Sequence, residues 1–244
     1  MYELLKKGAR GFIPNQWLLK YEPFIRRIIT LFYWGRKFQC NICEQKLSKF
    51  QLKNNKDKMC PACGSLPRNR RLWSLVAPLL NPNSNILHFS PSRSLSRKFN
   101  TLENIHYIST DFEEEFPALK HHDITAIDEP DASFDLILCY HVLEHIDKDK
   151  KAMEELFRVL KKGGHCFIQT PFKTGEIYEN PEIKSPEDKK LHFGQEDHVR
   201  IYSVEGLEKR LQQAGFKTTI KSFTPDPDDF NGFKQEELII ARKV

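Results

Sequence analysis

Four cysteines are arranged in two pairs whose spacing is typical of a metal site. Cys40 and Cys43 form the first pair, and Cys60 and Cys63 follow after sixteen intervening residues. Each pair can turn two thiolates toward one ion, and four thiolates complete the tetrahedral site of structural zinc. An iron–sulfur cluster or a redox pair is the alternative. We predict that zinc stabilises a small ribbon here and has no catalytic role.

A carboxylate stands where a nucleoside could be bound. Asp111 ends a predicted strand at residues 105–110, about 20 residues after the turn that follows a first strand at 85–89. A carboxylate suits a ribose diol because it offers two acceptor oxygens. Asp111 and its neighbour Phe112 are therefore candidate cofactor-binding residues, and a helix cap or a surface acid is the alternative for Asp111.

Further polar side chains follow an apolar run at residues 134–139. Tyr140 and His141 come directly after it, and we expect them to face a cofactor or a substrate. His145 lies four residues beyond His141, and a role in packing or capping is the simpler interpretation. A zinc site needs a third ligand besides two histidines, and the chain has no HExxH motif, so we exclude a metalloprotease.

A second polar group precedes a predicted helix that starts at Ser203. His198, oriented by Asp197, is a candidate general base, and Arg200 could hold an anionic group of the substrate. Tyr202 belongs to the same substrate-side group. The alternative is a hydrogen-bond network that only fixes the start of the helix.

Residues 133–170 predict the strand, helix and strand that position these groups. Apolar runs at 134–139 and 165–170 are typical of strands buried on both faces. We expect Asp147 to cap the helix between them and Gly163 to follow its end. The apolar positions that recur on one face of this helix are Ala152, Met153, Leu156, Phe157 and Leu160. Parallel sheets of this kind bind ligands at the carboxyl ends of their strands.

The segments FDLILCYHVLEHI and EELFRVLKKGG resemble the region after the fourth strand in class I S-adenosylmethionine (SAM) dependent methyltransferases. The resemblance is to the ubiquinone-biosynthesis-like group, methyltransferase type 11, and it extends over about residues 84–244. It implies an α/β, Rossmann-like, doubly wound fold. The expected sheet is seven-stranded and mostly parallel, with an antiparallel last strand. It also implies SAM as the methyl donor.

The same resemblance implies positions for SAM. In the family an acidic residue stands near the end of the first strand and a glycine-rich loop follows. This chain has His88 at the acidic position, and Ser90 and Ser92 at the glycine positions. We expect SAM to bind in an altered loop, and a relic whose zinc ribbon recruits a partner is the alternative. The implied cofactor contacts are His88, Ser90, Pro91, Ser92, the adenine pair Asp123 and Ile124, Tyr140 and His141.

Charge and composition suggest three parts: a helical segment at 1–35, a zinc ribbon at 36–71 and a methyltransferase domain at 72–244. Residues 1–80 hold 16 lysines and arginines against 4 acids, a net charge of +12, whereas the rest of the chain carries −7. A basic front suggests an anionic partner such as nucleic acid, a membrane surface or an acidic substrate. An ordinary solvated surface is the alternative.

Three segments leave their roles open. Pro23 could start a second helix, which would lie either at a membrane surface, with Arg26 and Arg27 at the headgroups, or against the catalytic domain. Arg68, Arg70 and Arg71 could clamp phosphates or brace a domain junction before a linker helix at 72–80. Residues 172–200 are polar and long enough for a lid, a binding loop or a disordered segment.

The expected function is SAM-dependent methyl transfer to an O or N nucleophile of a small molecule, such as a sugar or a lipid-linked metabolite. An RNA methyltransferase of the ribosomal RNA type is the alternative. No run of 18 apolar residues and no signal peptide pattern occurs, and the paired cysteines suit a reducing compartment. We therefore expect a cytoplasmic enzyme without a transmembrane segment.

Overall fold

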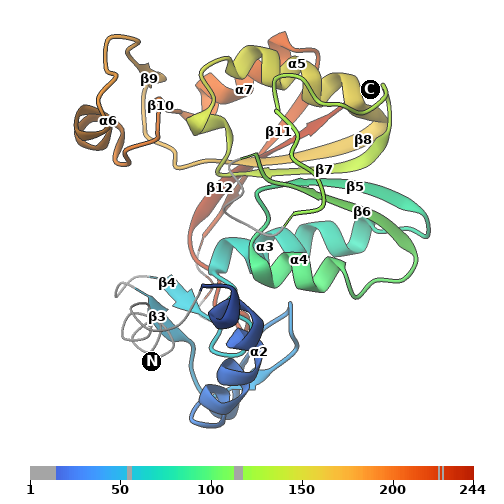
Figure 1. The fold of residues 1–244 in the computed structure, drawn as a ribbon, viewed down its shortest axis with the longest axis vertical. Helices are drawn as coiled ribbons and strands as arrows, with labels where there is room; N and C mark the ends of the chain where they lie inside the picture. The colour runs from blue at the N-terminus through green and yellow to red at the C-terminus, as the bar shows by residue number, and fades with distance from the viewer. Residues whose placement is uncertain (1–14, 54–56, 113–117, 225, 227) are drawn as a thin grey trace. The chain divides into compact units, whose positions relative to one another are not determined.

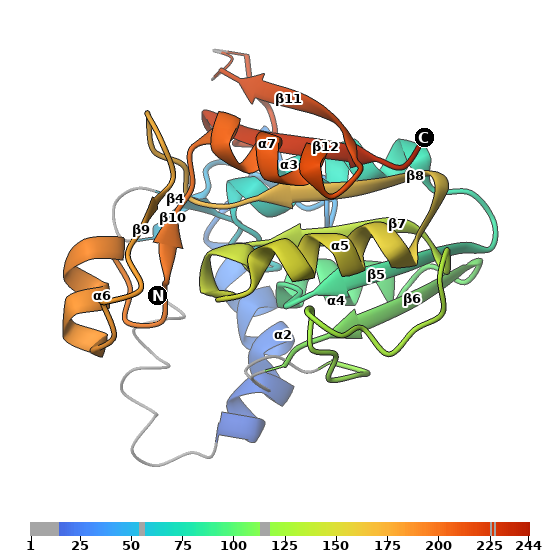
Figure 2. The same cartoon turned by 90° about the horizontal axis from the view of Figure 1, so that it is seen from above.

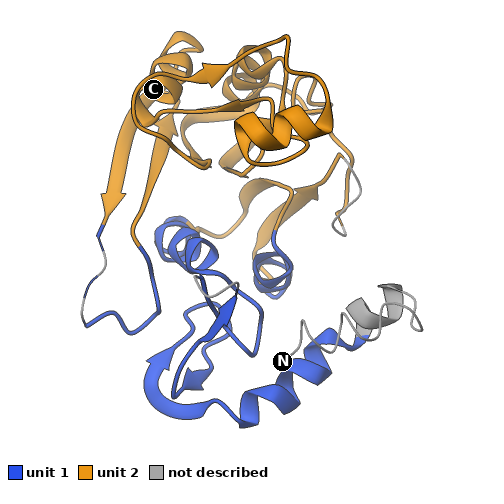
Figure 3. Ribbon diagram, turned by 90° about the vertical axis from the view of Figure 1, so that its left-hand side faces the viewer, with its two compact units in different colours: residues 1–79, 92–101, 224–234 blue, residues 80–91, 102–223, 235–244 orange. Residues whose placement is uncertain are grey.

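The computed structural model of this chain describes residues 15–53, 57–112, 118–224, 226 and 228–244, with side chains in the first helix described from residue 21. Contacts group the chain into two compact units (Figure 3). Unit 1 comprises residues 1–79, 92–101 and 224–234, and unit 2 comprises residues 80–91, 102–223 and 235–244. The helix predicted over residues 1–35 therefore lies partly outside the described residues, and the predicted boundaries at 35 and 71 stay predictions.

Unit 2 is built on a six-stranded sheet with the order β11-β12-β8-β7-β5-β6 (Figure 1). The strands are β5 (Ser84–Phe89), β6 (Ile105–Thr110), β7 (Phe134–Tyr140), β8 (Leu160–Gln169), β11 (Lys217–Phe223) and β12 (Glu236–Arg242). β5 pairs in parallel with β6 and β7, β7 pairs in parallel with β8, and β12 runs antiparallel to both β8 and β11. The Rossmann-like, mostly parallel sheet with an antiparallel last strand is confirmed.

The described residues supply six strands to this sheet, where seven were predicted. Between β6 and β7, the described residues make one isolated parallel bridge, Thr110 to Lys120. The sequence at residues 118–123 is ALKHHD, which has no apolar run to bury on a sheet face. A strand is therefore not favoured there.

Two helices, α5 (Asp149–Val159) and α7 (Val204–Gln213), lie on the same face of the sheet (Figure 2). Their apolar sides form one buried cluster with the strands, and Ala152, Met153 and Leu156 are fully enclosed in it. The Ser203 hydroxyl caps α7 by accepting a hydrogen bond from the Gly206 amide, as its position predicted.

The predicted ends of α5 are wrong. The helix begins after Lys148, no side chain caps it, and Asp147 lies one residue farther out. Its last residue is Val159, and Leu160 already starts β8, so Gly163 lies within that strand. Gly163 adopts φ 80° there and donates its amide to the Lys243 carbonyl. Its left-handed conformation falls where the register between β7 and β8 shifts, between Leu160 and His165, and does not end the helix.

Residues 172–200 are folded over much of their length. They contain β9 (Tyr178–Glu179) and α6 (Pro186–Phe193), and β9 pairs antiparallel with β10 (Arg200–Ile201). These elements gather at one end of the unit 2 sheet (Figure 1). A short 3-10 helix, η2 (Leu143–His145), follows β7. The carboxyl ends of the parallel strands and the residues around η2 are therefore the part of unit 2 where a site can form.

Unit 1 contains helices and two small antiparallel hairpins. The helices are α2 (Asn15–Leu31), α3 (Pro67–Val76), the 3-10 helix η1 (Ala77–Leu79) and α4 (Arg93–Phe99), and the hairpins pair β1 (Trp34–Gln39) with β2 (Lys46–Leu47) and β3 (Gln51–Lys53) with β4 (Asp57–Met59). The prediction that Pro23 starts a separate helix is wrong, because Pro23 lies inside α2. Within the described residues, no helix is long and apolar enough to cross a bilayer.

Buried ion pairs hold α2 within unit 1. The Glu22 carboxylate is 1% exposed and lies 2.8 Å from Arg26 Nε, 3.3 Å from Arg93 Nε and 3.5 Å from Arg97 Nη1. Arg26 is itself 2% exposed and donates to the Pro61 carbonyl at 3.4 Å. The interpretation of Arg26 as a membrane headgroup contact is therefore wrong, since the guanidinium is occupied inside unit 1.

Candidate functional site

The four paired cysteines of unit 1 converge on one point. Cys40 Sγ lies 3.7 Å from Cys63 Sγ, and Cys43 Sγ lies 3.7 Å from Cys60 Sγ. All four sulfur atoms are within 4.8 Å of one another. This cluster, the cysteine cluster below, has the separations that a single tetrahedral ion requires.

Two matching turns present these sulfurs. Glu44 donates its amide to the Cys40 carbonyl at 2.7 Å, and Gly64 donates to the Cys60 carbonyl at 2.9 Å. Both residues that follow a CxxC pair adopt left-handed backbone, with φ 62° at Glu44 and 78° at Gly64. The Ser65 hydroxyl lies 3.3 Å from Cys40 Sγ, within hydrogen-bond distance of this potential ligand atom.

Arg70 braces this module from inside. Its side chain is 0% exposed and donates to the carbonyls of Ser65 and Lys58, both at 2.7 Å. It also reaches the carbonyls of Asn231 at 2.6 Å and Gly232 at 2.7 Å, which come from the loop between β11 and β12. The suggestion that Arg70 clamps phosphates is therefore wrong, because its donors are consumed within unit 1.

In unit 2, the ends of β5 and β6 bring together two predicted cofactor residues. Ser90 follows β5 with φ 42° and donates its hydroxyl to Asp111 Oδ1 at 2.8 Å. Asp111 follows β6 and is 3% exposed. A carboxylate has about four lone-pair positions, so the hydrogen bond to Ser90 is compatible with a diol on the same group. The pair therefore fits the ribose of a nucleoside cofactor.

The other residues of the first loop have different surroundings. Pro91 is buried in unit 2, whereas Ser92 belongs to unit 1, where its hydroxyl accepts the Leu95 amide and caps α4. His88 is 2% exposed inside β5, with Nδ1 3.1 Å from the Tyr107 hydroxyl. Burial lowers the pKa of His88 to about 3, so the ring is neutral at ordinary pH.

The predicted adenine pair, Asp123 and Ile124, and the predicted cofactor residue Phe112 have different surroundings. Ile124 is 3% exposed and packs in the apolar core, and Asp123 accepts hydrogen bonds from the Thr125 amide and hydroxyl at 2.8 Å. Phe112 is 63% exposed. The roles of these three residues in cofactor binding stay predictions.

The end of β7 presents Tyr140 and His141, as predicted. Tyr140 is 8% exposed, and His141 adopts φ 56° and donates its amide to the Gln169 carbonyl at 2.8 Å. The left-handed residue turns the chain out of the sheet into η2. His141 Nδ1 lies 3.2 Å from Glu144 Oε1.

The proposed dyad of Asp197 and His198 does not form. Asp197 Oδ2 lies 3.0 Å from His145 Nδ1, whereas His198 Nδ1 lies 3.2 Å from the Phe193 carbonyl. The rings of His145 and His198 meet edge to face, with centroids 4.6 Å apart. Burial and the neighbouring His145 lower the pKa of His198. Asp197 therefore orients His145, the histidine that the sequence assigned to packing or capping.

Arg200 and Tyr202 form the internal network that the sequence left as the alternative. Arg200 is 6% exposed, and it pairs with Glu179 at 2.8 Å and donates to carbonyls in and after η2. The Tyr202 hydroxyl is buried and donates to Asp149 Oδ2 at 2.5 Å, and burial is the main cause that raises the pKa of Tyr202. These side chains tie β10 to the start of α5.

Sequence reasoning missed Glu144. It is 1% exposed in η2, and among the described residues neither carboxylate oxygen accepts a hydrogen bond. Glu144, His145 and His198 offer ligand atoms that all lie within 4.8 Å of one another. The available signal was an acid within the otherwise apolar stretch that leaves β7, HVLEHI.

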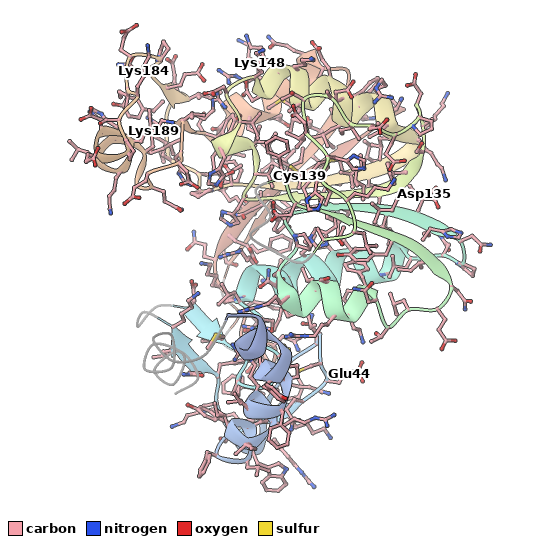
Figure 4. The ribbon with its side chains drawn as sticks, viewed as in Figure 1. Glu44, Asp135, Cys139, Lys148, Lys184 and Lys189 are labelled. Carbon is pink, nitrogen blue, oxygen red and sulfur yellow. The ribbon has the colours of Figure 1, made fainter. Side chains whose placement is uncertain are left out.

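A cavity of about 910 Å³ lies beside this region in unit 2. The acidic side chains that line it are Asp147, which precedes α5, Asp149 and Glu154 of α5, and Glu179 of β9. The cationic side chains that line it are Lys148, Lys150, Lys151, Lys184, Lys189, Arg200 and Arg210. Figure 4 shows Lys148, Lys184 and Lys189 at the same end of unit 2. The excess of cations suits a ligand with a negative group.

Comparison with known proteins gives consistent results. Residues 66–220, more than half of the chain, match the model of a family described as methyltransferase domain. The chain is 28% identical over 99 residues to a probable S-adenosylmethionine-dependent methyltransferase of Mycolicibacterium smegmatis, which covers 41% of this chain and 35% of that protein. It is 25% identical over 150 residues to the sterol 24-C-methyltransferase of Eremothecium gossypii, which covers 60% of this chain and 36% of that protein.

The chain thus spans about a third of the length of these curated relatives. Among solved structures, the YcgJ protein of Bacillus subtilis has a TM-score of 0.50 and 13% identity, covering 72% of this chain and 99% of that one. That likeness concerns the fold alone. The family match, the order of the sheet and the curated relatives agree with the resemblance seen in the sequence, and the chain belongs to the methyltransferase domain family of class I SAM-dependent methyltransferases.

Proposed function

We propose that this protein transfers a methyl group from SAM to an O or N nucleophile of a small-molecule acceptor. The observation that supports this most directly is the Ser90–Asp111 pair, a buried carboxylate at the carboxyl edge of the sheet within hydrogen-bond distance of the loop after β5. That is where open parallel sheets bind nucleoside cofactors.

SAM supplies a methyl group already activated by a positively charged sulfur. The protein has to hold the donor, align the acceptor and exclude water. Asp111 would hold the ribose, and Tyr140 and His141 would border the reacting groups from the end of β7. A hydroxyl acceptor needs a base, and His141 is the candidate nearest to this edge, whereas an amine with a free lone pair needs no base.

The cavity lined by the start of α5 and the segment around α6 supports a small acceptor that carries a negative group. Its lysines come from α5 and from the segment around α6, which closes one end of unit 2. Arg200 and Tyr202 contribute by fixing β10 and not by direct contact, since their polar atoms are engaged within the protein.

The test is SAM binding by calorimetry on the full-length protein. Asp111→Ala should weaken binding at least tenfold, because the ribose hydroxyls lose their acceptor. Asp128→Ala, which removes an exposed carboxylate of the same unit, is the control and should bind as wild type. Unchanged affinity in Asp111→Ala contradicts the ribose assignment. A wild-type protein that binds no SAM at all supports the relic, with the cysteine cluster as an interaction module.

RNA is the second candidate acceptor, and the charge of +12 over residues 1–80 favours it. The burial of Arg70 weakens it, because one predicted phosphate contact is lost. Binding of RNA that falls steeply with salt concentration supports this candidate, and transfer of labelled methyl to small molecules in cell extract with no RNA binding excludes it.

The cysteine cluster supports a structural zinc ion held by Cys40, Cys43, Cys60 and Cys63, since the four sulfurs leave no open position for catalysis. None of the six cysteines forms a disulfide in the structure, which agrees with the reducing, cytoplasmic setting that we propose. A peripheral membrane contact is supported by exposed apolar side chains in and after α2: Phe24, Ile28, Leu31, Phe32 and Trp34. Flotation with anionic vesicles tests this contact, and absence of binding removes it.

A further inference from the structure

Three side chains in unit 2 form a second group of potential metal ligands, far in sequence from any CxxC pair. Glu144 and His145 come from η2, and His198 comes from the segment between α6 and β10. One ligand atom from each lies within 4.8 Å of those of the other two. Two imidazoles and one carboxylate are the ligand set of many sites for zinc, iron or manganese.

The surroundings of Glu144 suit a carboxylate that binds a cation. Its side chain is 1% exposed, and among the described residues neither oxygen accepts a hydrogen bond. His141 Nδ1 lies 3.2 Å from Glu144 Oε1, but the imidazole carries a charge only when it is protonated. A buried carboxylate without donors is costly, and such groups are normally paired or bound to a metal.

The two histidines are oriented as metal ligands are. Asp197 Oδ2 lies 3.0 Å from His145 Nδ1, and the Phe193 carbonyl lies 3.2 Å from His198 Nδ1. In each case an oxygen atom lies within hydrogen-bond distance of Nδ1, so the other ring nitrogen, Nε2, is available for an ion, as in the usual outer-shell arrangement of a metal-bound histidine. His198 Nε2 is buried and has no hydrogen-bond partner among the described residues.

The backbone holds the two contributing segments together. The Val199 amide donates to the Glu144 carbonyl at 2.9 Å, and Arg200 donates to the Leu143 carbonyl at 3.3 Å. The two residues that follow His198 are thus hydrogen-bonded to η2. The ligand group is therefore built into the fold and does not depend on a mobile side chain.

We infer that Glu144, His145 and His198 bind a divalent first-row transition metal ion in unit 2, separate from the cysteine cluster. Three protein ligands leave coordination positions open, as in catalytic metal sites. If the proposed methyl transfer holds, an oxygen of the acceptor would occupy such a position, and the ion would favour its deprotonated form. The substrate class is then an acceptor with a hydroxyl that ligates metal.

Titration with Mn²⁺, followed by its electron paramagnetic resonance, tests the site in the zinc-loaded full-length protein. Manganese favours oxygen and imidazole ligands over thiolates, so the cysteine cluster does not contribute. The expected result is one Mn²⁺ per chain. Glu144→Gln and His198→Gln should weaken binding more than tenfold, and Asp197→Asn should weaken it by about 10-fold to 100-fold because His145 loses its orienting partner.

His106→Gln is the matched control, since His106 is an exposed histidine on β6 of the same unit, and it should bind Mn²⁺ as wild type. Circular dichroism confirms that each variant is folded. The site is refuted if wild type binds no Mn²⁺ at millimolar concentration, or if folded Glu144→Gln and His198→Gln bind like wild type. Should either variant fail to fold, the wild-type stoichiometry and Asp197→Asn decide alone. SAM binding is measured separately, so failure of the proposed function leaves this result interpretable.

Discussion

Two buried polar side chains of unit 2, Glu144 and His88, differ in their surroundings. Among the described residues no group donates a hydrogen bond to the Glu144 carboxylate, whereas burial keeps His88 neutral and its Nδ1 lies 3.1 Å from the Tyr107 hydroxyl. The pKa of His88 is about 3 in the native protein and about 6.5 in the unfolded chain. Between pH 3 and pH 6.5 the unfolded chain therefore binds a proton at His88 that the native protein does not bind. The stabilising effect is therefore complete above pH 6.5 and is lost as the pH falls toward 3.

His88 should consequently account for much of the loss of stability as the pH falls below 7. We expect the free energy of unfolding to fall between pH 7 and pH 5 by about 2 kcal/mol less in His88→Gln than in wild type. Urea unfolding at the two pH values measures this difference. His106→Gln, on the exposed face of the neighbouring strand, should show the wild-type decrease. An equal decrease in His88→Gln contradicts the assignment.

Arg70 gives a second prediction at this scale. Its guanidinium donates to four carbonyls, and burial lowers its pKa. Lysine keeps the charge but cannot reach all four acceptors with the same fork. Arg70→Lys should lower the unfolding free energy by about 2–4 kcal/mol, measured by thermal or urea unfolding. Arg36→Lys, at an exposed position, should be neutral, and a neutral Arg70→Lys would show that the network contributes nothing.

At the scale of elements, local patterns predicted strands better than they predicted ends and partners. The strand predicted at 105–110 has the bounds of β6, and the strand predicted at 134–139 is one residue shorter than β7. The prediction that Asp147 caps α5 is wrong, because Lys148 is the residue before the helix and no side chain caps it. Asp111 follows β6 as expected, but pairing His198 with Glu144 requires a contact between residues 54 positions apart. Sequence spacing carries no information about such contacts.

The loop between β11 and β12 contains a position, Gly232, that only glycine can occupy without strain. Gly232 has φ 66°, and a Cβ there would lie 2.3 Å from Cε2 of Phe50. Gly175 has φ 89° with nothing within 4 Å, so it shares the backbone strain without the collision. Gly175→Ala should cost about 1–2 kcal/mol of unfolding free energy, and Gly232→Ala at least about 1 kcal/mol more. Equal losses by urea unfolding would show that Phe50 moves freely.

For the molecule as a whole, the two units should differ in their dependence on metal. Zinc in the cysteine cluster would stabilise unit 1, whereas the apolar core of unit 2 forms between its sheet and the helices α5 and α7. Chelation, or Cys60→Ser, should make residues of unit 1 the first sites of limited proteolysis, identified by mass spectrometry. Cys139→Ser, at a buried cysteine outside the cluster, should leave zinc content unchanged. First cleavage within unit 2 contradicts this division.

The loop between β11 and β12 also affects the order in which the protein folds during synthesis. The Asn231 side chain donates to the Gln39 carbonyl at 2.8 Å, and Arg70 bonds to the carbonyls of Asn231 and Gly232. During synthesis, the ribosome releases residues 34–79 long before residue 231 emerges. The part of the protein made first therefore reaches its final set of contacts among the last, and a nascent chain stalled before residue 224 would carry a ribbon that still lacks its support.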